Sequence, residues 1–388
     1  MARPAAPGAP GEPGERGEPG TPGAPQEWQA GGLTLRRTEE NLAEIDELAQ
    51  VLGGRAGLGE LLGDLRFQAR RSLPGRLLGR AVDRAIAFDS YDQRDRVWWP
   101  QGVTTSADAS DSELVAGRRV LVTSWYAKPV DGVHRGSRLT FLDLETLRYR
   151  HVLLVDVRRG SEGALELSGV RIHAGGVVWA GPYLHVAATG RGFLTFHLDD
   201  LMRVPGDNER PDEIGIEDRG VASFGHHHVL PVRSAYRAEA EEGHERLRYS
   251  FLSLDRSSAP PALVVGEYGR GRQTTRLARV ELDPATWLPA LGAQDAALPL
   301  LHRAAGPRGM QGVVVARGRH HVSVSRGPWT PGSLHTGTPG ALREHRWALP
   351  MGPEDLAYWP STDRLWTVTE HPHRRWLVSV PRARLDPA

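Results

Sequence analysis

The segment Met351–Trp376, MGPEDLAYWPSTDRLWTVTEHPHRRW, has the pattern of two strands joined by a turn and followed by the start of a third strand. Its apolar residues alternate on both sides of the Pro-Ser-Thr-Asp turn, which is typical of a β-meander. Glu354 and Asp355 stand where the first strand begins. If the meander is one blade of a propeller, that position lies at the central channel, where ligands and metals collect.

Four units of the same character precede this segment. Each contains three or four short strands separated by Gly, Pro, Asp or Ser turns, with almost no helix between them. These units begin at Gln101, His173, His226 and Gln311. Because one blade cannot bury both of its faces, the five meanders predict an all-β fold, a five-bladed β-propeller over residues 85–388. A pair of stacked sheets is the alternative.

The chain before the propeller has two predicted parts. Glycine occupies every third position from Gly8 to Pro25, the period of collagen, but six triplets are few. We therefore predict a disordered collagen-like tail over residues 1–32, with a weak homotrimer as the alternative. Residues 33–84 are expected to form a small helical appendage. Its three predicted helices cover Thr38–Leu52, Leu58–Arg71 and Pro74–Ala85.

The last unit shows only three strands, which leaves its outer edge open. We expect the stretch Ala85–Tyr91, AIAFDSY, to add the missing outer strand, since closure of this kind removes an exposed sheet edge.

Composition excludes several classes of protein. The 48 basic and 47 acidic residues among 388 leave a net charge of +1, so no overall field favours nucleic acid. Cysteine is absent, which excludes disulfides and thiolate metal sites. No apolar run is long enough to span a membrane. The N-terminus lacks the apolar core of a signal peptide, and the compartment stays open between cytoplasmic and extracellular.

The units open with a recurring motif, a polar residue beside or close to glycine. Such positions begin the innermost strands of a propeller, so we expect the side chains to converge at the channel mouth. The converging residues would be Gln101, His173, His226, Gln311 and Glu354. An uncompensated carboxylate costs several kcal/mol to bury. We therefore predict that Glu354 and His173 bind a divalent cation, with Ca²⁺ as the first candidate. The alternative is that these groups only satisfy backbone at the mouth.

Two function classes fit this pattern. In the first, the protein is a hydrolase or lyase acting on a small or carbohydrate-like substrate, with His226 or Glu267 as catalytic base and Gln101 and Gln311 in contact with substrate. In the second, it is a non-catalytic module that binds a carbohydrate or protein and oligomerises through its N-terminal segment. Aromatic residues proposed for the rim in either class are Trp125, Tyr126, Trp179, Trp329 and Trp359.

Several segments between Trp98 and Arg382 resemble a family of predicted secreted proteins with a five-bladed propeller-like core and no assigned activity. They are VTSWYA, GSRLTFLDLETLRYRHVLLV, IHAGGVVWAGPYLHVA, SFLSLDR, LVVGEY, MGPEDLAYWP and LWTVTEH. The resemblance implies the propeller fold and secretion. It implies no reaction.

The GPEDLAY stretch is also similar, more distantly, to the Pro-Glu-Gly motif of calcium-dependent lactonase and nucleotidase propellers. That resemblance implies a central ion bound by Glu354. Asp355 stands where that motif has glycine.

Overall fold

The computed structural model describes residues 27–72, 78–206, 210–218 and 220–385. These residues form six sheets, of which five contain four or more strands and one is the hairpin of β15 (Ile214–Glu217) and β16 (Gly220–Ser223). Helix is scarce in the described part. The α-helices are α1 (Leu42–Leu52), α2 (Gly57–Gly63), α3 (Ser90–Arg94) and α4 (Ser106–Ala109).

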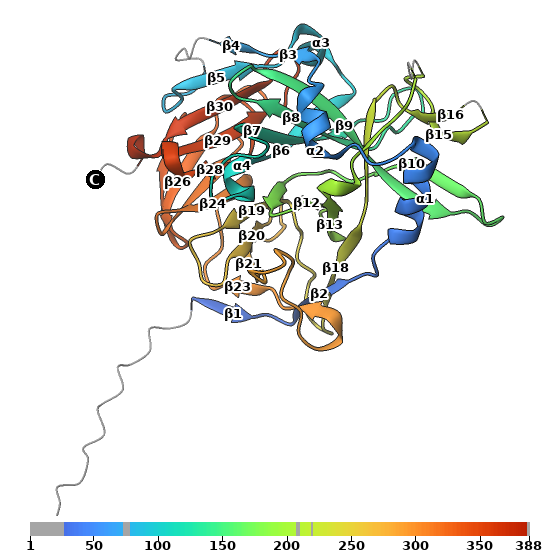
Figure 1. Cartoon of the computed structure of the whole chain (residues 1–388). Helices are drawn as coiled ribbons and strands as arrows, with labels where there is room; N and C mark the ends of the chain where they lie inside the picture. The colour runs from blue at the N-terminus through green and yellow to red at the C-terminus, as the bar shows by residue number, and fades with distance from the viewer. Residues whose placement is uncertain (1–26, 73–77, 207–209, 219, 386–388) are drawn as a thin grey trace, which may run out of the picture.

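Each of the five larger sheets contains a run of antiparallel neighbours that ascends in chain order (Figure 1). The first is β6 (Trp98–Thr105), β7 (Val120–Ala127), β8 (Ser137–Asp143) and β9 (Arg148–Arg159). The second is β11 (Val177–Ala180), β12 (Tyr183–Ala187), β13 (Gly192–His197) and β18 (Ser234–Ala240). The third is β19 (Phe251–Asp255), β20 (Ala262–Gly266), β21 (Leu277–Glu281) and β23 (Leu300–His302).

The fourth sheet is β24 (Met310–Ala316), β25 (Arg319–Val324), β26 (Ser333–Thr338) and β27 (Ala341–His345). The fifth is β28 (Pro353–Trp359), β29 (Arg364–Thr369), β30 (Trp376–Pro381), β5 (Arg84–Ala87) and β4 (Arg70–Ser72). The predicted addition of this stretch to the last unit is confirmed, because Ile86 pairs with Leu377 in an antiparallel register. It is not the outer strand of the sheet, since β4 pairs with its other side. The addition is shorter than predicted, since Ser90 and Tyr91 already belong to α3.

The first strands of the five sheets are neighbours in a closed order: β6, β11, β19, β24, β28 and again β6. Glycines of the opening motifs explain this close approach. A Cβ on Gly102 would lie 2.7 Å from the backbone N of Val177, and one on Gly312 would lie 2.4 Å from that of Leu356. Backbone therefore packs against backbone where side chains would keep the strands apart. The all-β, propeller-like arrangement is confirmed.

An apolar core fills the space between each pair of neighbouring sheets. Residues contributed by the two sheets of each core include Trp125 with Trp366, Phe141 with Trp179, Val178 with Leu252, Val264 with Val313, and Val314 with Leu356. Alternation along the strands supplies these residues, since every second side chain points toward the adjacent sheet.

The segment before Ala85 differs from the expected helical appendage. Strand β2 (Leu33–Arg37) pairs with β18, and β3 (Phe67–Gln68) pairs with β9. Helix α1 lies inside the first predicted helix, but the second ends at Gly63, and residues 78–85 contain no α-helix. Open sheet edges explain the difference, because a strand satisfies edge N–H and C=O groups that a helix cannot reach. The boundaries at 32/33 and 84/85 stay predictions.

The Gly-X-Y run from Gly8 to Pro25 lies outside the described residues. Within the tail predicted over residues 1–32, Trp28–Ala30 form β1, which pairs with β23 on the edge of the third sheet (Figure 1).

The third unit was predicted to begin at His226, and this is wrong. The innermost strand of the third sheet is β19, whereas β17 (His228–Pro231) adds in parallel to β9 on the first sheet, and β14 (Met202–Arg203) pairs with β17. Strand β10 (Leu165–Gly169) also pairs with β9, and β22 (Ala296–Ala297) pairs with β2. Within the described ranges, no helix is long and apolar enough to cross a membrane.

Candidate functional site

Three of the innermost strands carry an irregularity at the same level. The pairing register shifts between Pro100 and Val103 in β6, between Met310 and Gly312 in β24, and between Pro353 and Leu356 in β28. A bulge places two residues opposite one and re-aims their side chains. The residues inside these shifts are Gln101 with Gly102, Gln311, and Glu354 with Asp355.

Two glutamates form the centre of this site. Gln311 Nε2 donates a hydrogen bond to Glu354 Oε1 at 3.1 Å, and Gln101 Nε2 donates to Glu370 Oε2 at 3.2 Å. Glu354 is buried, whereas Glu370 is half-buried. The structure thus brings together three residues predicted from the opening motif and adds Glu370, which the sequence analysis missed. We call Gln101, Gln311, Glu354 and Glu370 the axial cluster.

The position of Glu370 could have been found from the pairing of its hairpin. Glu370 follows the last residue of β29, and Thr369 pairs with Pro353 at the start of β28. In an antiparallel hairpin, the end of the second strand lies beside the beginning of the first. Glu370 therefore emerges at the same edge as Glu354.

The two carboxyl groups differ in how easily they ionise. Burial raises the pKa of Glu354 well above its ordinary value, and the nearby Glu370 and Asp355 carboxyls raise it further. Burial also raises the pKa of Glu370, but Gln101, Lys128 and Arg375 oppose that rise. Glu370 consequently ionises first, and its charge helps to keep the proton on Glu354.

Two tyrosines border the axial cluster. Burial raises the pKa of Tyr126, and the carboxyls of Glu370 and Glu354 raise it further. Burial and the same two carboxyls also raise the pKa of Tyr268, which follows β20 by two residues. Both phenols therefore remain protonated at neutral pH and can donate hydrogen bonds.

The cationic side of the cluster comes from two residues. Arg375 is fully buried, and its Nε donates to the backbone oxygen of Glu370 at 3.0 Å. Burial lowers the pKa of Arg375 to about 10. Burial also lowers the pKa of Lys128, although Glu370 opposes this, and the Lys128 ammonium lies 3.2 Å from the centre of the Trp99 ring.

Asp355, next to the acid pair, connects three innermost strands. Its Oδ1 accepts from the Leu356 N–H at 2.9 Å, and its Oδ2 accepts from the N–H groups of Val103 and Val177 at 3.3 and 3.4 Å. Burial raises the pKa of Asp355 well above its usual range. The residue that replaces glycine in the distantly similar motif thus has a structural position between β28, β6 and β11.

His173 stands at the surface, outside the axial cluster. It lies in the loop between β10 and β11, and its ring centre is 4.6 Å from that of Tyr126. The two rings line a shallow cavity of about 440 Å³ together with Arg171 and Arg191. Within the described ranges, no hydrogen bond or ion pair joins His173 to Glu354.

Neither predicted catalytic base lies in the axial cluster. Glu267 is fully buried and accepts hydrogen bonds from Thr274 Oγ1 and from Arg276 Nε at 3.1 Å. Burial alone would raise the pKa of Glu267, but Arg276 and Thr274 lower it, so the carboxylate is a poor base. His226 packs against Trp98 at 5.4 Å between ring centres. Burial lowers the pKa of His226 to about 3.

The tryptophans proposed for an aromatic rim are mostly core residues. Trp125, Trp179 and Trp359 are buried, so their predicted exposure is wrong. The alternation of apolar residues cannot distinguish a rim position from the core between two sheets, and the large apolar ring favours the core. Trp329 is the exception, with 80% of its surface exposed.

A second buried polar cluster was not predicted. Asp92 Oδ1 accepts a hydrogen bond from Arg138 Nη2 at 2.7 Å, and its Oδ2 lies 3.0 Å from His151 Nε2. His151 Nδ1 lies 2.7 Å from Thr140 Oγ1. Burial alone would raise the pKa of Asp92, but His151 and Arg138 hold it well below its usual range. All four residues of this cluster are buried, whereas Glu370 and Gln311 of the axial cluster are partly exposed.

The described residues offer few donor groups for the predicted metal ion. No group of three or more His, Asp or Glu side chains is placed to hold a metal ion in the part of the chain that the structure describes. Glu354 and Glu370 are oxygen donors of the kind that Ca²⁺ prefers, and Gln101 and Gln311 could add amide oxygens. A metal at the axial cluster therefore stays a proposal.

The sequence matches no protein-family model and no curated protein. The fold is similar to that of a gluconolactonase from Xanthomonas campestris, with 12% identity, a TM-score of 0.35, and coverage of 95% of this chain and 90% of that chain. It is also similar to CoXyl43, a GH43 β-xylosidase/α-arabinofuranosidase from a compost microbial metagenome, with 10% identity, a TM-score of 0.36, and coverage of 78% and 94%. A third structure is the β-propeller domain of Cps50 (Swd1) from Myceliophteria thermophila, with 12% identity, a TM-score of 0.34, and coverage of 74% and 98%. No activity, substrate or metal of these proteins passes to this chain at such identities.

Proposed function

We propose that the protein is a hydrolase that acts on a small, carbohydrate-like substrate at the axial cluster. The observation that supports this most directly is the acid pair: Glu354 and Glu370 are close enough to interact electrostatically, and each accepts a hydrogen bond from a different glutamine, Gln311 and Gln101. A protonated acid next to an ionised base is the arrangement that cleaves an acetal or an ester with water.

In this mechanism each glutamate has one task. Protonated Glu354 donates its proton to the leaving oxygen, and ionised Glu370 accepts a proton from the attacking water. The water oxygen forms the new bond to carbon as the bond to the leaving oxygen breaks, so protons and electrons balance. Gln101 and Gln311 hold the two carboxyls in place.

The residues around the pair suit a polyhydroxylated ligand. Tyr126 and Tyr268 offer protonated phenols, and Tyr126 and His173 line the neighbouring cavity with ring faces. Sugar-like molecules combine hydroxyl groups with apolar ring faces, so both kinds of contact would be used. This is the basis for proposing a carbohydrate-like substrate.

The proposal includes the architecture. We infer that the five larger sheets are the five blades of one propeller, and that the axial cluster lies at their common centre. The closed order of innermost strands and the apolar core between each pair of sheets support this count.

Calcium binding is an alternative to this acid–base role of the same residues. If both carboxyls were ionised, Glu354 and Glu370 would supply the charge for the ion and the two glutamines the neutral oxygens, and a bound ion would polarise the substrate oxygen. His173 is not needed for such a site.

The test is hydrolysis of a panel of 4-nitrophenyl glycosides and aldonolactones, with and without Ca²⁺. Glu354→Gln and Glu370→Gln should each lower kcat by roughly 10²- to 10⁴-fold, the usual contribution of a general acid or base. Glu162→Gln, at an exposed hairpin turn, is the matched control and should leave kcat unchanged. Full activity in both axial variants would overturn the proposal.

A binding module is the second candidate, because Trp329 is highly exposed and the Arg374 guanidinium lies 5.2 Å from its ring centre. Binding of a sugar that produces no product and is lost in Trp329→Ala would favour it over the hydrolase.

A further inference from the structure

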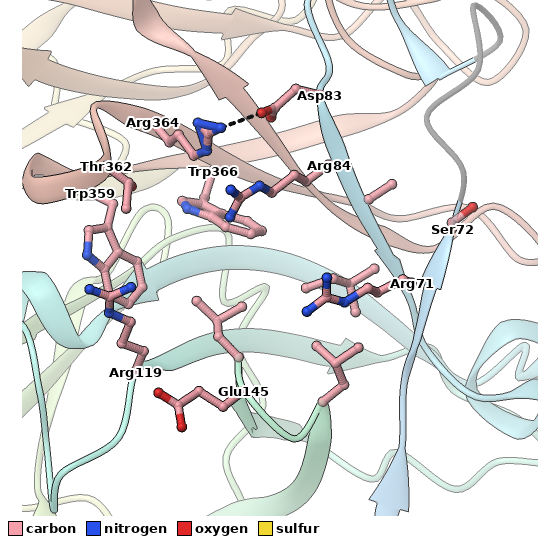
Figure 2. A pocket seen from close by; sticks show the side chains of 14 residues that line it. Arg71, Ser72, Asp83, Arg84, Arg119, Glu145, Trp359, Thr362, Arg364 and Trp366 are labelled. Carbon is pink, nitrogen blue, oxygen red and sulfur yellow. Dashed lines mark ion pairs between the residues drawn. The ribbon is translucent and has the colours of Figure 1, made fainter.

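A cavity of about 580 Å³ lies at the other end of the hairpin that carries the axial cluster (Figure 2). One wall is the fifth sheet, with Trp366 and Arg364 on β29 and Arg84 on β5. The other wall is the turn between β8 and β9, which contributes Glu145, together with Arg119 just before β7. The volume is in the range of small-molecule sites.

The cavity and the axial cluster are separate. Glu354 is the second residue of β28 and Trp359 is its last, so the strand itself separates them by roughly 17 Å at about 3.3 Å per residue. Different side chains line the two places, and neither shares a residue with the other.

The lining of the cavity is cationic. Four arginines and two acids, Asp83 and Glu145, leave a net charge of +2. Arg364 is paired with Asp83 at 2.6 Å. In contrast, Arg71, Arg84 and Arg119 form no ion pair with any described residue, and Figure 2 shows them reaching toward the cavity from both walls.

Two buried donors at the cavity also lack a partner. Trp366 Nε1 and Arg364 Nε are shielded from solvent and donate no hydrogen bond within the described residues. The Trp366 side chain is only 3% exposed. An unsatisfied buried donor costs about 1–3 kcal/mol, a penalty that an acceptor in the cavity would relieve.

These observations require a ligand with several acceptor oxygens, a negative charge and an apolar part. A phosphomonoester carries up to two negative charges and three terminal oxygens, which match the net charge and the forked donors of arginine. Apolar walls are provided by Leu144, Leu147 and Ile86, and the Trp359 ring lies 6.0 Å from the Arg119 guanidinium. We propose that this cavity binds an organic phosphate whose body is aromatic or otherwise apolar.

The test is isothermal titration of the full chain with phenyl phosphate, inorganic phosphate and benzyl alcohol. Phenyl phosphate should bind at one saturable site, more tightly than either of the others, and its affinity should fall as salt is added. Binding of benzyl alcohol as tight as that of phenyl phosphate, or no saturable binding of phenyl phosphate at millimolar concentration, would overturn the proposal.

Variants locate the site. Arg71→Gln and Arg84→Gln should each weaken phenyl phosphate binding by roughly tenfold, as expected for loss of a charge-assisted hydrogen bond. Arg70→Gln is the matched control: it removes the same charge from the same strand, β4, but Arg70 does not line the cavity. Equal weakening in Arg70→Gln would show that only overall charge matters.

Trp366→Phe removes the unpartnered donor without changing charge. It should weaken phenyl phosphate binding, and because Trp366 also packs in an apolar core, circular dichroism must show that the variant is folded. Unchanged binding in this variant, with an intact fold by circular dichroism, would contradict the placement of the phosphate.

Discussion

Replacing Glu354 by Gln should stabilise the protein at neutral pH, in contrast to most changes of a buried polar residue. The side chain keeps its shape and its contact with Gln311 but loses the proton equilibrium. In the native protein, burial raises the pKa of Glu354, whereas the unfolded chain has the ordinary value of about 4.3. Between these two values the folded state holds a proton that the unfolded state has released.

The sign and size of the effect follow from this difference. The stability contributed by protonated Glu354 is fully present below about pH 4.3 and falls as the pH rises toward the folded pKa. The loss is about 1.4 kcal/mol for each pH unit in that window. The free energy of unfolding of Glu354→Gln, minus that of the native protein, should therefore be flat at low pH, rise with that slope and then level off.

The assay is equilibrium unfolding by guanidinium chloride between pH 4 and 9, followed by tryptophan fluorescence, in buffers that contain a chelator. Glu162→Gln serves as the control for loss of an exposed carboxyl. In a Glu370→Gln background the rise should end at a lower pH, because the charge that helps to hold the proton on Glu354 is gone. A difference curve that is flat throughout would refute the assignment of a buried, proton-retaining carboxyl.

Three further predictions concern the metal, the second polar cluster and the packing of the innermost strands. If the axial cluster binds calcium, added Ca²⁺ should raise the Tm of the native protein and not that of Glu354→Gln. The reason is that a ligand that binds only the folded state stabilises it by mass action. Equal Tm shifts in both proteins would exclude the site. Asp92→Asn should lower the free energy of unfolding by about 3–5 kcal/mol, because it leaves the buried Arg138 without its carboxylate. Denaturant unfolding measures this change, and a loss below about 1 kcal/mol would contradict the buried pair. Gly312→Ala should lower the free energy of unfolding by about 1–3 kcal/mol or more, because the new Cβ forces β24 away from β28. The control Gly59→Ala, whose new Cβ meets nothing within 4 Å, should not destabilise the protein. Equal melting temperatures for the two variants would contradict the close approach of the two strands.

The axial cluster was predictable from sequence only in part. Gln101, Gln311 and Glu354 share an opening motif with glycine, and a repeated motif in a repeated unit occupies equivalent places. Glu370 has no such motif, and its position depends on pairing with Pro353 across the hairpin. His226 resembles the motif but precedes a strand that joins another sheet, which no local pattern indicates.

The roles of charged and aromatic residues were harder to predict than their secondary structure. Glu267 looks like a candidate base until Arg276, nine residues away, is seen to neutralise it. Trp125 and Trp179 occupy alternating strand positions that fit a rim as well as a core. Burial and partners come from contacts between distant segments, and periodicity contains no information about them.

The sequence by itself determined the local structure: alternating apolar residues and turn residues produce meanders, and glycines mark where backbones approach. Tertiary structure decided which meanders are neighbours, that β17 joins the first sheet, and that Glu354 lies beside Glu370. The physical reason is range. Strand formation depends on residues two apart. The ionisation of a carboxyl depends on how much water is excluded around it and on which charges lie within a few ångström, and both are set only when the sheets pack against one another.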